Sequence, residues 1–203
     1  MSLYVREVTM AKERELYIVL TNTGTVLANV ISYCTKEHLS HVSIAFDSDL
    51  REVYSFGRKY QRNPFIGGFI REDLTGPVFL RSQCAIYRMK VSQQSYDTIR
   101  TQIDHFIHYA NHYHYNFLGM IAVYFNIPWD RRNHYFCSQF VSTILINAEL
   151  ELFNKETTLV TPGDFLDAQL ELIYRGRLRS YLGGQRHGLS ESYQPAYKLV
   201  QKL

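Results

Sequence analysis

The chain has 203 residues, a formal net charge of +3 and a hydrophobic share of 46%, which predict one domain over residues 1–203 with a full-sized core. This charge is too small to indicate nucleic-acid binding. The three cysteines, Cys34, Cys84 and Cys137, are too widely spaced for a disulfide framework or a CxxC zinc site, so we assign neither a metal nor another cofactor.

Targeting signals are not visible in the sequence. Residues Met1 to Arg14 contain no apolar core of the kind that a signal peptide needs. The longest apolar stretch, Phe117 to Phe125, is far shorter than the roughly 20 residues that cross a bilayer as a helix. We therefore expect a cytoplasmic protein without a transmembrane segment.

The first part of the chain is predicted to be mostly strand. Glu15 to Leu20 has the composition of a buried strand, and Val26 to Thr35 favours a helix or a helical turn. Two strands, His41 to Asp47 and Glu52 to Phe56, flank a polar turn and predict a hairpin. Gly57 to Gly68 contains Asn-Pro and Gly-Gly pairs and is interpreted as a loop.

The second part combines one more strand with helices. Ala85 to Val91 is predicted to be a strand. Ser95 to Asn111 and Phe136 to Ala148 carry apolar residues at helical spacing, and Tyr115 to Phe125 adds a short buried segment. Thr161 to Asp164 has the residues that open a helix, with threonine as N-cap and proline at the first position. The expected fold class is therefore α+β.

Two segments about a hundred residues apart suggest chemistry. His41 opens a predicted strand, and Cys137 lies in the first turn of a predicted helix. The N-terminal end of a helix favours a thiolate, and its free N–H groups can hold an oxyanion. A histidine held in a sheet could complete a thiolate–imidazolium couple. A lone cysteine is equally often a small buried apolar residue, so spacing alone leaves both interpretations open.

Several motifs around these two residues together resemble one family. They are His41 to Ile44, Tyr54 to Lys59, Asn63 to Phe69 and Phe136 to Val141. The chain resembles the circularly permuted NlpC/P60 papain-like proteins, and within them the YiiX-like group of bacterial proteins. In that family the histidine strand precedes the cysteine helix, as it does here, and the resemblance covers about Leu16 to Leu166.

The resemblance implies a papain-like fold in which a small antiparallel sheet packs on the cysteine helix. It also implies hydrolysis of an amide or ester, or acyl transfer, by Cys137 as nucleophile and His41 as base. Permuted relatives orient the histidine with a polar residue on the following strand, commonly Glu, Gln or His. The matching position here is Ser55, which can accept a hydrogen bond but cannot stabilise an imidazolium as a carboxylate does.

Three further residues are candidates for substrate contacts. Tyr115 and Asn116 belong to a segment that resembles the one before the cysteine helix in this superfamily, where it lines the substrate groove; core packing is an equal alternative. Gln139 follows Cys137 by two positions and could face the same cleft. His105, His108 and His112 share a helix stripe opposite the apolar face, so a solvated surface is favoured over a metal site.

The leading hypothesis is a cysteine hydrolase, an amidase, peptidase or esterase, that works through a thioester acyl-enzyme. Its partners would be a small-molecule, peptide or lipid acyl substrate, and no nucleic acid. One alternative is a lipid acyltransferase of the lecithin–retinol acyltransferase type, although those relatives carry a second histidine where this chain has Ser55. Another is a catalytically weak module that binds a lipid or peptide.

Overall fold

The computed structural model of this chain describes residues 13–22, 39–60 and 63–186. An antiparallel sheet of six strands forms its centre, in the order β4-β3-β2-β1-β5-β8. The strands are β1 (Arg14–Asn22), β2 (His41–Ala45), β3 (Val53–Tyr60), β4 (Asn63–Arg71), β5 (Gln83–Val91) and β8 (Glu171–Arg177). The two short strands β6 (His114–Tyr115) and β7 (His134–Tyr135) pair separately in parallel.

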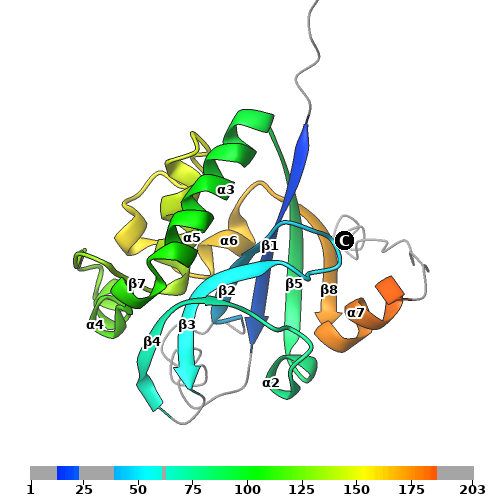
Figure 1. Cartoon of the computed structure of the whole chain (residues 1–203), viewed down its shortest axis with the longest axis horizontal. Helices are drawn as coiled ribbons and strands as arrows, with labels where there is room; N and C mark the ends of the chain where they lie inside the picture. The colour runs from blue at the N-terminus through cyan, green and yellow to red at the C-terminus, as the bar shows by residue number, and fades with distance from the viewer. Residues whose placement is uncertain (1–12, 23–38, 61–62, 187–203) are drawn as a thin grey trace, which may run out of the picture.

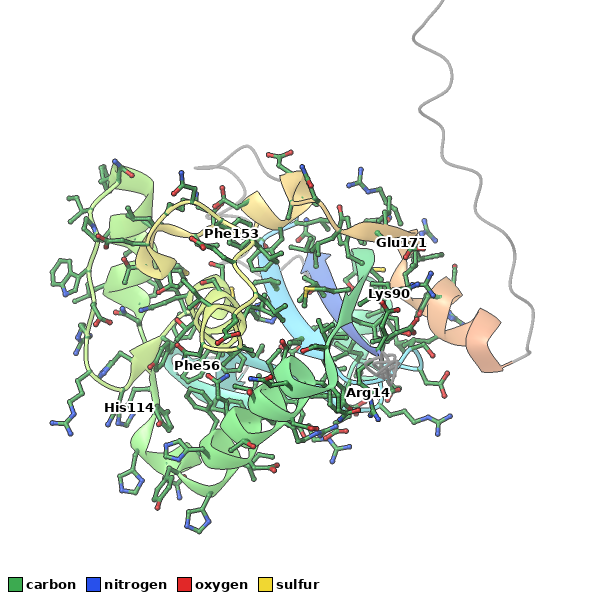
Figure 2. All side chains as sticks on the ribbon, turned by 90° about the horizontal axis from the view of Figure 1, so that it is seen from above. Arg14, Phe56, Lys90, His114, Phe153 and Glu171 are labelled. Carbon is green, nitrogen blue, oxygen red and sulfur yellow. The ribbon has the colours of Figure 1, made fainter. Side chains whose placement is uncertain are left out.

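The helices are distributed over both faces of the sheet, which confirms the α+β class. They are α2 (Pro77–Leu80), α3 (Gln93–His108), α4 (Phe117–Ala122), α5 (Cys137–Ile146), α6 (Asp164–Asp167) and α7 (Leu178–Arg186), with 3₁₀ turns η1 (Ala110–His112), η2 (Val123–Phe125) and η3 (Thr157–Leu159). Figure 1 shows α3 and α5 together on one side of the sheet, with α7 at the opposite edge beside β8, and Figure 2 shows the same structure from above with its side chains. None of the described helices is both long enough and apolar enough to pass through a bilayer.

Successive strand residues point to opposite faces of the sheet, and each face has its own core. Ile18 and Ile44 belong to the larger cluster, which includes side chains of α3 and α5. Val19 and Ala45 belong to the smaller cluster, which α2 and α7 cover. Because β1 is buried on both faces, its sequence is a continuous apolar run and not an alternating one.

Most of the long predicted elements are confirmed. The Glu15 to Leu20 strand lies within β1, the hairpin is formed by β2 and β3, and Ala85 to Val91 lies within β5. The helices predicted over Ser95 to Asn111 and Phe136 to Ala148 are α3 and α5. Ile107 is an exposed apolar residue of α3. The helix predicted over Val26 to Thr35, which includes Cys34, falls outside the described residues.

The predicted loop from Gly57 to Gly68 is wrong, because strands β3 and β4 pair through most of this segment. Gly57 and Gly68 are opposite each other in the ladder. A Cβ atom on Gly67 would lie 2.6 Å from the Gly57 carbonyl oxygen and 2.9 Å from Tyr115 Cβ, so glycine here allows a close approach and does not mark a turn. Proline is tolerated because β4 is an edge strand.

The C-terminal region departs from the prediction in two ways. The helix expected after Thr161 is the single turn α6, although Thr161 and Asp164 do exchange the reciprocal hydrogen bonds of a capping box. Strand β8, which carries several charged residues, was not predicted. This strand is the second edge of the sheet, where charged side chains are common.

Candidate active site

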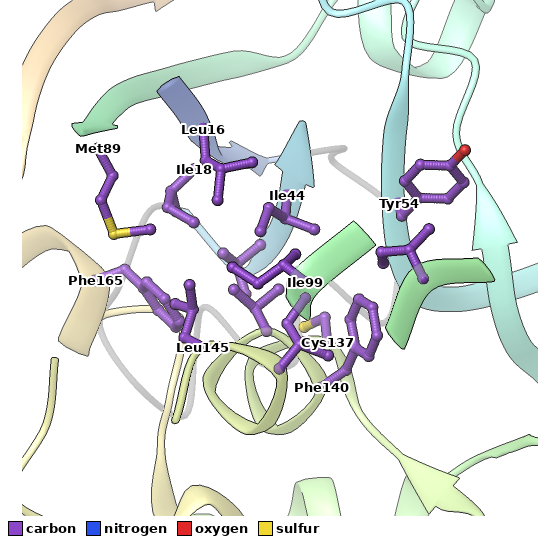
Figure 3. Packing of buried hydrophobic residues seen from close by; sticks show 14 of the residues in the cluster. Leu16, Ile18, Ile44, Tyr54, Met89, Ile99, Cys137, Phe140, Leu145 and Phe165 are labelled. Atoms are coloured by element: carbon purple, nitrogen blue, oxygen red, sulfur yellow. The ribbon is translucent and has the colours of Figure 1, made fainter. Parts of the chain in front are cut away.

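Cys137 is the first residue of α5, and the packing of that helix fixes its position. Phe140, one turn further on, packs its ring at a tilt against Phe56 of β3 with 5.1 Å between centroids, and edge-to-face against Phe106 of α3 at 5.2 Å. Figure 3 shows Cys137 beside Phe140 among buried side chains of the larger cluster. The aromatic contacts therefore hold the N-terminal turn of α5, which favours a thiolate, against the sheet.

His41 is the first residue of β2, and the structure brings it to Cys137, whose thiol is its hydrogen-bond partner. The described ladder between β2 and β3 ends at Ile44, so the two strands part toward His41. The backbone N–H groups of Val42 and Ser138 also interact with the Cys137 sulfur and favour its thiolate form. The thiol thus meets the imidazole and two N–H donors where the sheet opens.

Glu72 is a site residue that the sequence analysis missed. It directly follows β4, where its backbone N–H donates to the Val53 carbonyl oxygen. Its Oε1 lies 2.6 Å from Nε2 of His41, and its side chain is 1% exposed. Because Nε2 is engaged by this carboxylate, the other ring nitrogen, Nδ1, is the one left for Cys137. Cys137, His41 and Glu72 therefore form a continuous hydrogen-bonded chain.

Ser55 does not contact His41 in the way that we expected, since its hydroxyl donates to Glu72 instead. The distance from Ser55 Oγ to Oε1 is 2.5 Å. Ser43 Oγ donates to the other oxygen, Oε2, at 2.7 Å. The prediction that Ser55 orients His41 directly is corrected in this respect: Glu72 contacts the imidazole, and two serines fix the carboxylate.

The charges of this site stabilise one another. Burial alone would lower the pKa of His41, but the attraction of the Glu72 carboxylate and the interactions with Cys137 raise it to about 10. Burial would raise the pKa of Glu72, but the charge of His41 and the hydrogen bonds from His41, Ser55 and Ser43 lower it. At neutral pH the pair is therefore an imidazolium facing a carboxylate.

Burial and the neighbouring groups also have opposite effects on the pKa of Cys137. Burial raises the pKa of its thiol, whereas the hydrogen bond and charge of His41 and the N–H groups of Val42 and Ser138 lower it, and the lowering prevails. Cys84, the other described cysteine, behaves in the opposite way: burial raises its pKa to about 12. Of these two thiols, only Cys137 has a pKa below the ordinary value of a cysteine.

Asn116 and Tyr115 serve the local structure. Asn116 is fully buried and caps α4: its Oδ1 accepts the Gly119 N–H at 3.0 Å, and its Nδ2 donates to the Trp129 carbonyl oxygen at 3.2 Å. This bonding corrects the expectation that Asn116 lines a substrate groove. Tyr115 packs against the core and donates its hydroxyl to the Met120 sulfur at 3.1 Å.

Gln139 lies one helical position beyond Ser138 and is almost completely buried. Its Nε2 donates to Asp130 Oδ1 at 3.5 Å. Its Oε1 has no hydrogen-bond partner among the described residues. Of the three predicted substrate contacts, Gln139 is the one whose side chain keeps an unused acceptor next to the Cys137 turn.

The predicted histidine stripe runs from α3 into η1 and shows no metal-site geometry among the described residues. His105, His108 and His112 are exposed, and His105 Nε2 lies 3.0 Å from the Tyr113 hydroxyl. Within the described parts of the chain, no group of three or more His, Cys, Asp or Glu side chains is arranged to hold a metal ion.

Comparisons with protein-family models, with curated proteins and with solved structures each found no match. The resemblance to the permuted NlpC/P60 proteins therefore depends on the motifs of the sequence alone.

Proposed function

We propose that this chain is a cysteine hydrolase or acyltransferase of the permuted papain-like type, with Cys137, His41 and Glu72 as its catalytic groups. The observation that carries the proposal is the chain of hydrogen bonds from the thiol through the imidazole to a buried carboxylate. Nucleophile, base and orienting group in this order are the elements of a catalytic triad.

In the proposed first half-reaction the Cys137 thiolate attacks an acyl carbonyl carbon and forms a C–S bond. Negative charge develops on the carbonyl oxygen, and the backbone N–H of Cys137, which lacks a partner within α5, is placed to stabilise it. As the bond to the leaving oxygen or nitrogen breaks, His41 donates its proton to that atom. The product is a thioester on Cys137 and a neutral imidazole.

In the second half-reaction a water molecule, an amine or a hydroxyl attacks the thioester. His41 removes a proton from the attacking group, and the Cys137 thiolate leaves with the electrons of the C–S bond. Glu72 holds the ring in one orientation and stabilises its protonated form in both steps. Ser43 and Ser55 are positioning residues, because they act on His41 only through Glu72.

The structure removes the reason for considering a catalytically weak binding module, which was the absence of a carboxylate at the Ser55 position. That alternative depended on Ser55 as the partner of His41, whereas the partner in the structure is a carboxylate. Either water or another acceptor can resolve the thioester in the second step, so acyltransferase activity is part of the proposal.

A test is to mix the protein with 4-nitrophenyl esters of short and long acyl chains and to follow intact mass. We expect a mass increase of one acyl group, located on Cys137 by peptide mapping, and its decay in water. Faster decay in the presence of an added amine or alcohol would indicate transfer to that acceptor.

The matched control is Cys84→Ala, which removes a buried thiol with a raised pKa and should still form the acyl-enzyme. The proposal would be contradicted if no ester acylated the folded protein, or if Cys137→Ala were acylated to the same extent as the wild type.

A further inference from the structure

An exposed apolar surface next to the candidate active site has no role in the proposed chemistry. It consists of five large side chains from α4, η2 and the loop that follows, each between 39% and 72% exposed: Leu118, Ile121, Phe125, Ile127 and Trp129. We call these five residues the α4 patch. In Figure 1, α4 and β7 lie at the edge of the molecule opposite β8 and α7.

The α4 patch is not explained by the packing of its own helix. The inward side of this segment, with Met120 and Val123, is already buried against Phe136 in a separate small core. The outward side, with Leu118 and Ile121, is apolar too. A surface helix normally carries polar residues on its outward side, and one that is apolar all round indicates a second apolar contact.

Hydrogen bonds hold the loop of the patch in a fixed shape. Ile127 donates its backbone N–H to the Ala122 carbonyl oxygen at 3.1 Å, after a left-handed turn at Asn126. The Trp129 carbonyl oxygen accepts from Asn116 at 3.2 Å. The large side chains are therefore presented in a defined arrangement in advance of any contact.

The charged residues that directly follow the patch are predominantly basic. Arg131 and Arg132 follow directly, and Arg132 is exposed in the turn that ends with the His134 N–H bonded to the Arg131 carbonyl oxygen at 3.0 Å. The neighbouring acid, Asp130, accepts a hydrogen bond from Gln139. Aromatic and aliphatic side chains beside arginines match the boundary of an anionic bilayer, where rings lie among headgroups and guanidinium groups meet phosphates.

We propose that the α4 patch docks on the surface of an anionic lipid bilayer, with Arg131 and Arg132 contacting the headgroups. A second copy of the chain fits less well, because a twofold contact through this patch would bring two such arginine pairs to one interface. Since the segment leads through β7 into Cys137, docking would bring the first turn of α5 toward the lipid surface. The proposal does not depend on whether Cys137 is reactive.

The test uses the only tryptophan of the chain, Trp129, as a reporter within the patch. The full chain is titrated with vesicles of phosphatidylcholine alone and of phosphatidylcholine and phosphatidylglycerol in equal parts. We expect a blue shift of the emission and co-flotation with the anionic vesicles, both weakened by salt. Brominated acyl chains should quench the emission.

Two double variants separate the apolar contribution to vesicle binding from the ionic one. The double variant Phe125→Ser, Ile127→Ser keeps Trp129 as the reporter and should reduce partitioning onto anionic vesicles at least about tenfold. Arg131→Gln with Arg132→Gln should reduce it roughly 25-fold, about fivefold for each arginine. Ile107→Ser and Ile146→Ser replace similarly exposed residues outside the patch and should leave partitioning unchanged.

Three results would overturn the proposal. The first is an unchanged spectrum and no flotation with the anionic vesicles. The second is a blue shift that grows with protein concentration in the absence of lipid, together with a dimer in sedimentation, which would assign the patch to a second copy. The third is lipid binding that survives both patch variants but is lost in the Ile107 or Ile146 variant, which would place it on another surface.

Discussion

Replacing Cys137 by serine is expected to lower kcat/KM for an activated ester by about a millionfold, the size of effect seen when a nucleophile is removed. The reason is specific to this site. The Glu72 carboxylate, which the serine variant keeps, favours a protonated His41, and an imidazolium cannot take a proton from a serine hydroxyl. The wild-type site instead lowers the pKa of the Cys137 thiol, which favours direct attack by a thiolate.

The measurement for Cys137→Ser is initial-rate ester hydrolysis beside the wild-type protein and Cys84→Ala. Cys84 belongs to the cluster on the opposite face of the sheet, away from α5, so its loss should change kcat/KM by little. Activity of Cys137→Ser close to that of the wild type, or equal losses in both cysteine variants, would show that another group carries the reaction.

The second large effect is expected for Glu72→Gln, which keeps an acceptor for His41 but removes the charge. We expect kcat/KM to fall by roughly two to three orders of magnitude, less than the 10⁴ known for a serine triad because a thiol ionises more readily. Without the carboxylate, burial lowers the pKa of His41 with less opposition. The alkaline limb of the pH–rate profile should then move down from about pH 10.

Two comparisons separate charge from structure at this position. Ser55→Ala removes one hydrogen bond to Glu72 and leaves the carboxylate in place, so its effect should be smaller, about tenfold. Asp73→Asn changes the neighbouring exposed acid, whose contacts are with Thr75, and should leave the profile unchanged. A Glu72→Gln protein with the wild-type rate and alkaline limb would remove Glu72 from the mechanism.

His41 and Cys137 could be predicted from the sequence because each begins an element. A histidine at the start of an apolar strand and a cysteine at the start of an apolar helix are local patterns, and the packing of α5 on β2 and β3 brings them together. The proximity itself is a long-range contact that depends on the opening of the sheet, and no local pattern indicates that opening.

Glu72 was not predicted because most of the strand before it was interpreted as a loop. Without β4 there is no register that places Glu72 beside Val53 and hence near His41. Its neighbours Arg71 and Asp73 are exposed, so the three charged residues together resemble a surface turn. Only the register of β4 on β3 shows that Glu72 is the buried residue of the three.

A usable signal was present in the two strands of the hairpin. His41 and Ser43 are two positions apart and therefore share a face, and the pairing of Ile44 with Tyr54 extends to place Ser43 opposite Ser55. Buried serines on facing strands beside a histidine indicate a polar group that they bind. Looking for a carboxylate within reach of that face would have pointed to Glu72.

The most direct test of the reactive couple is the pH dependence of alkylation by iodoacetamide in a Cys34→Ala, Cys84→Ala protein, in which Cys137 is the single thiol. The comparison is the same protein with His41→Ala. We expect an apparent pKa well below the free-thiol value of about 8.5, and a rise toward or above that value without His41. Slow alkylation with no inflection below the free-thiol value, unchanged by His41→Ala, would contradict the account.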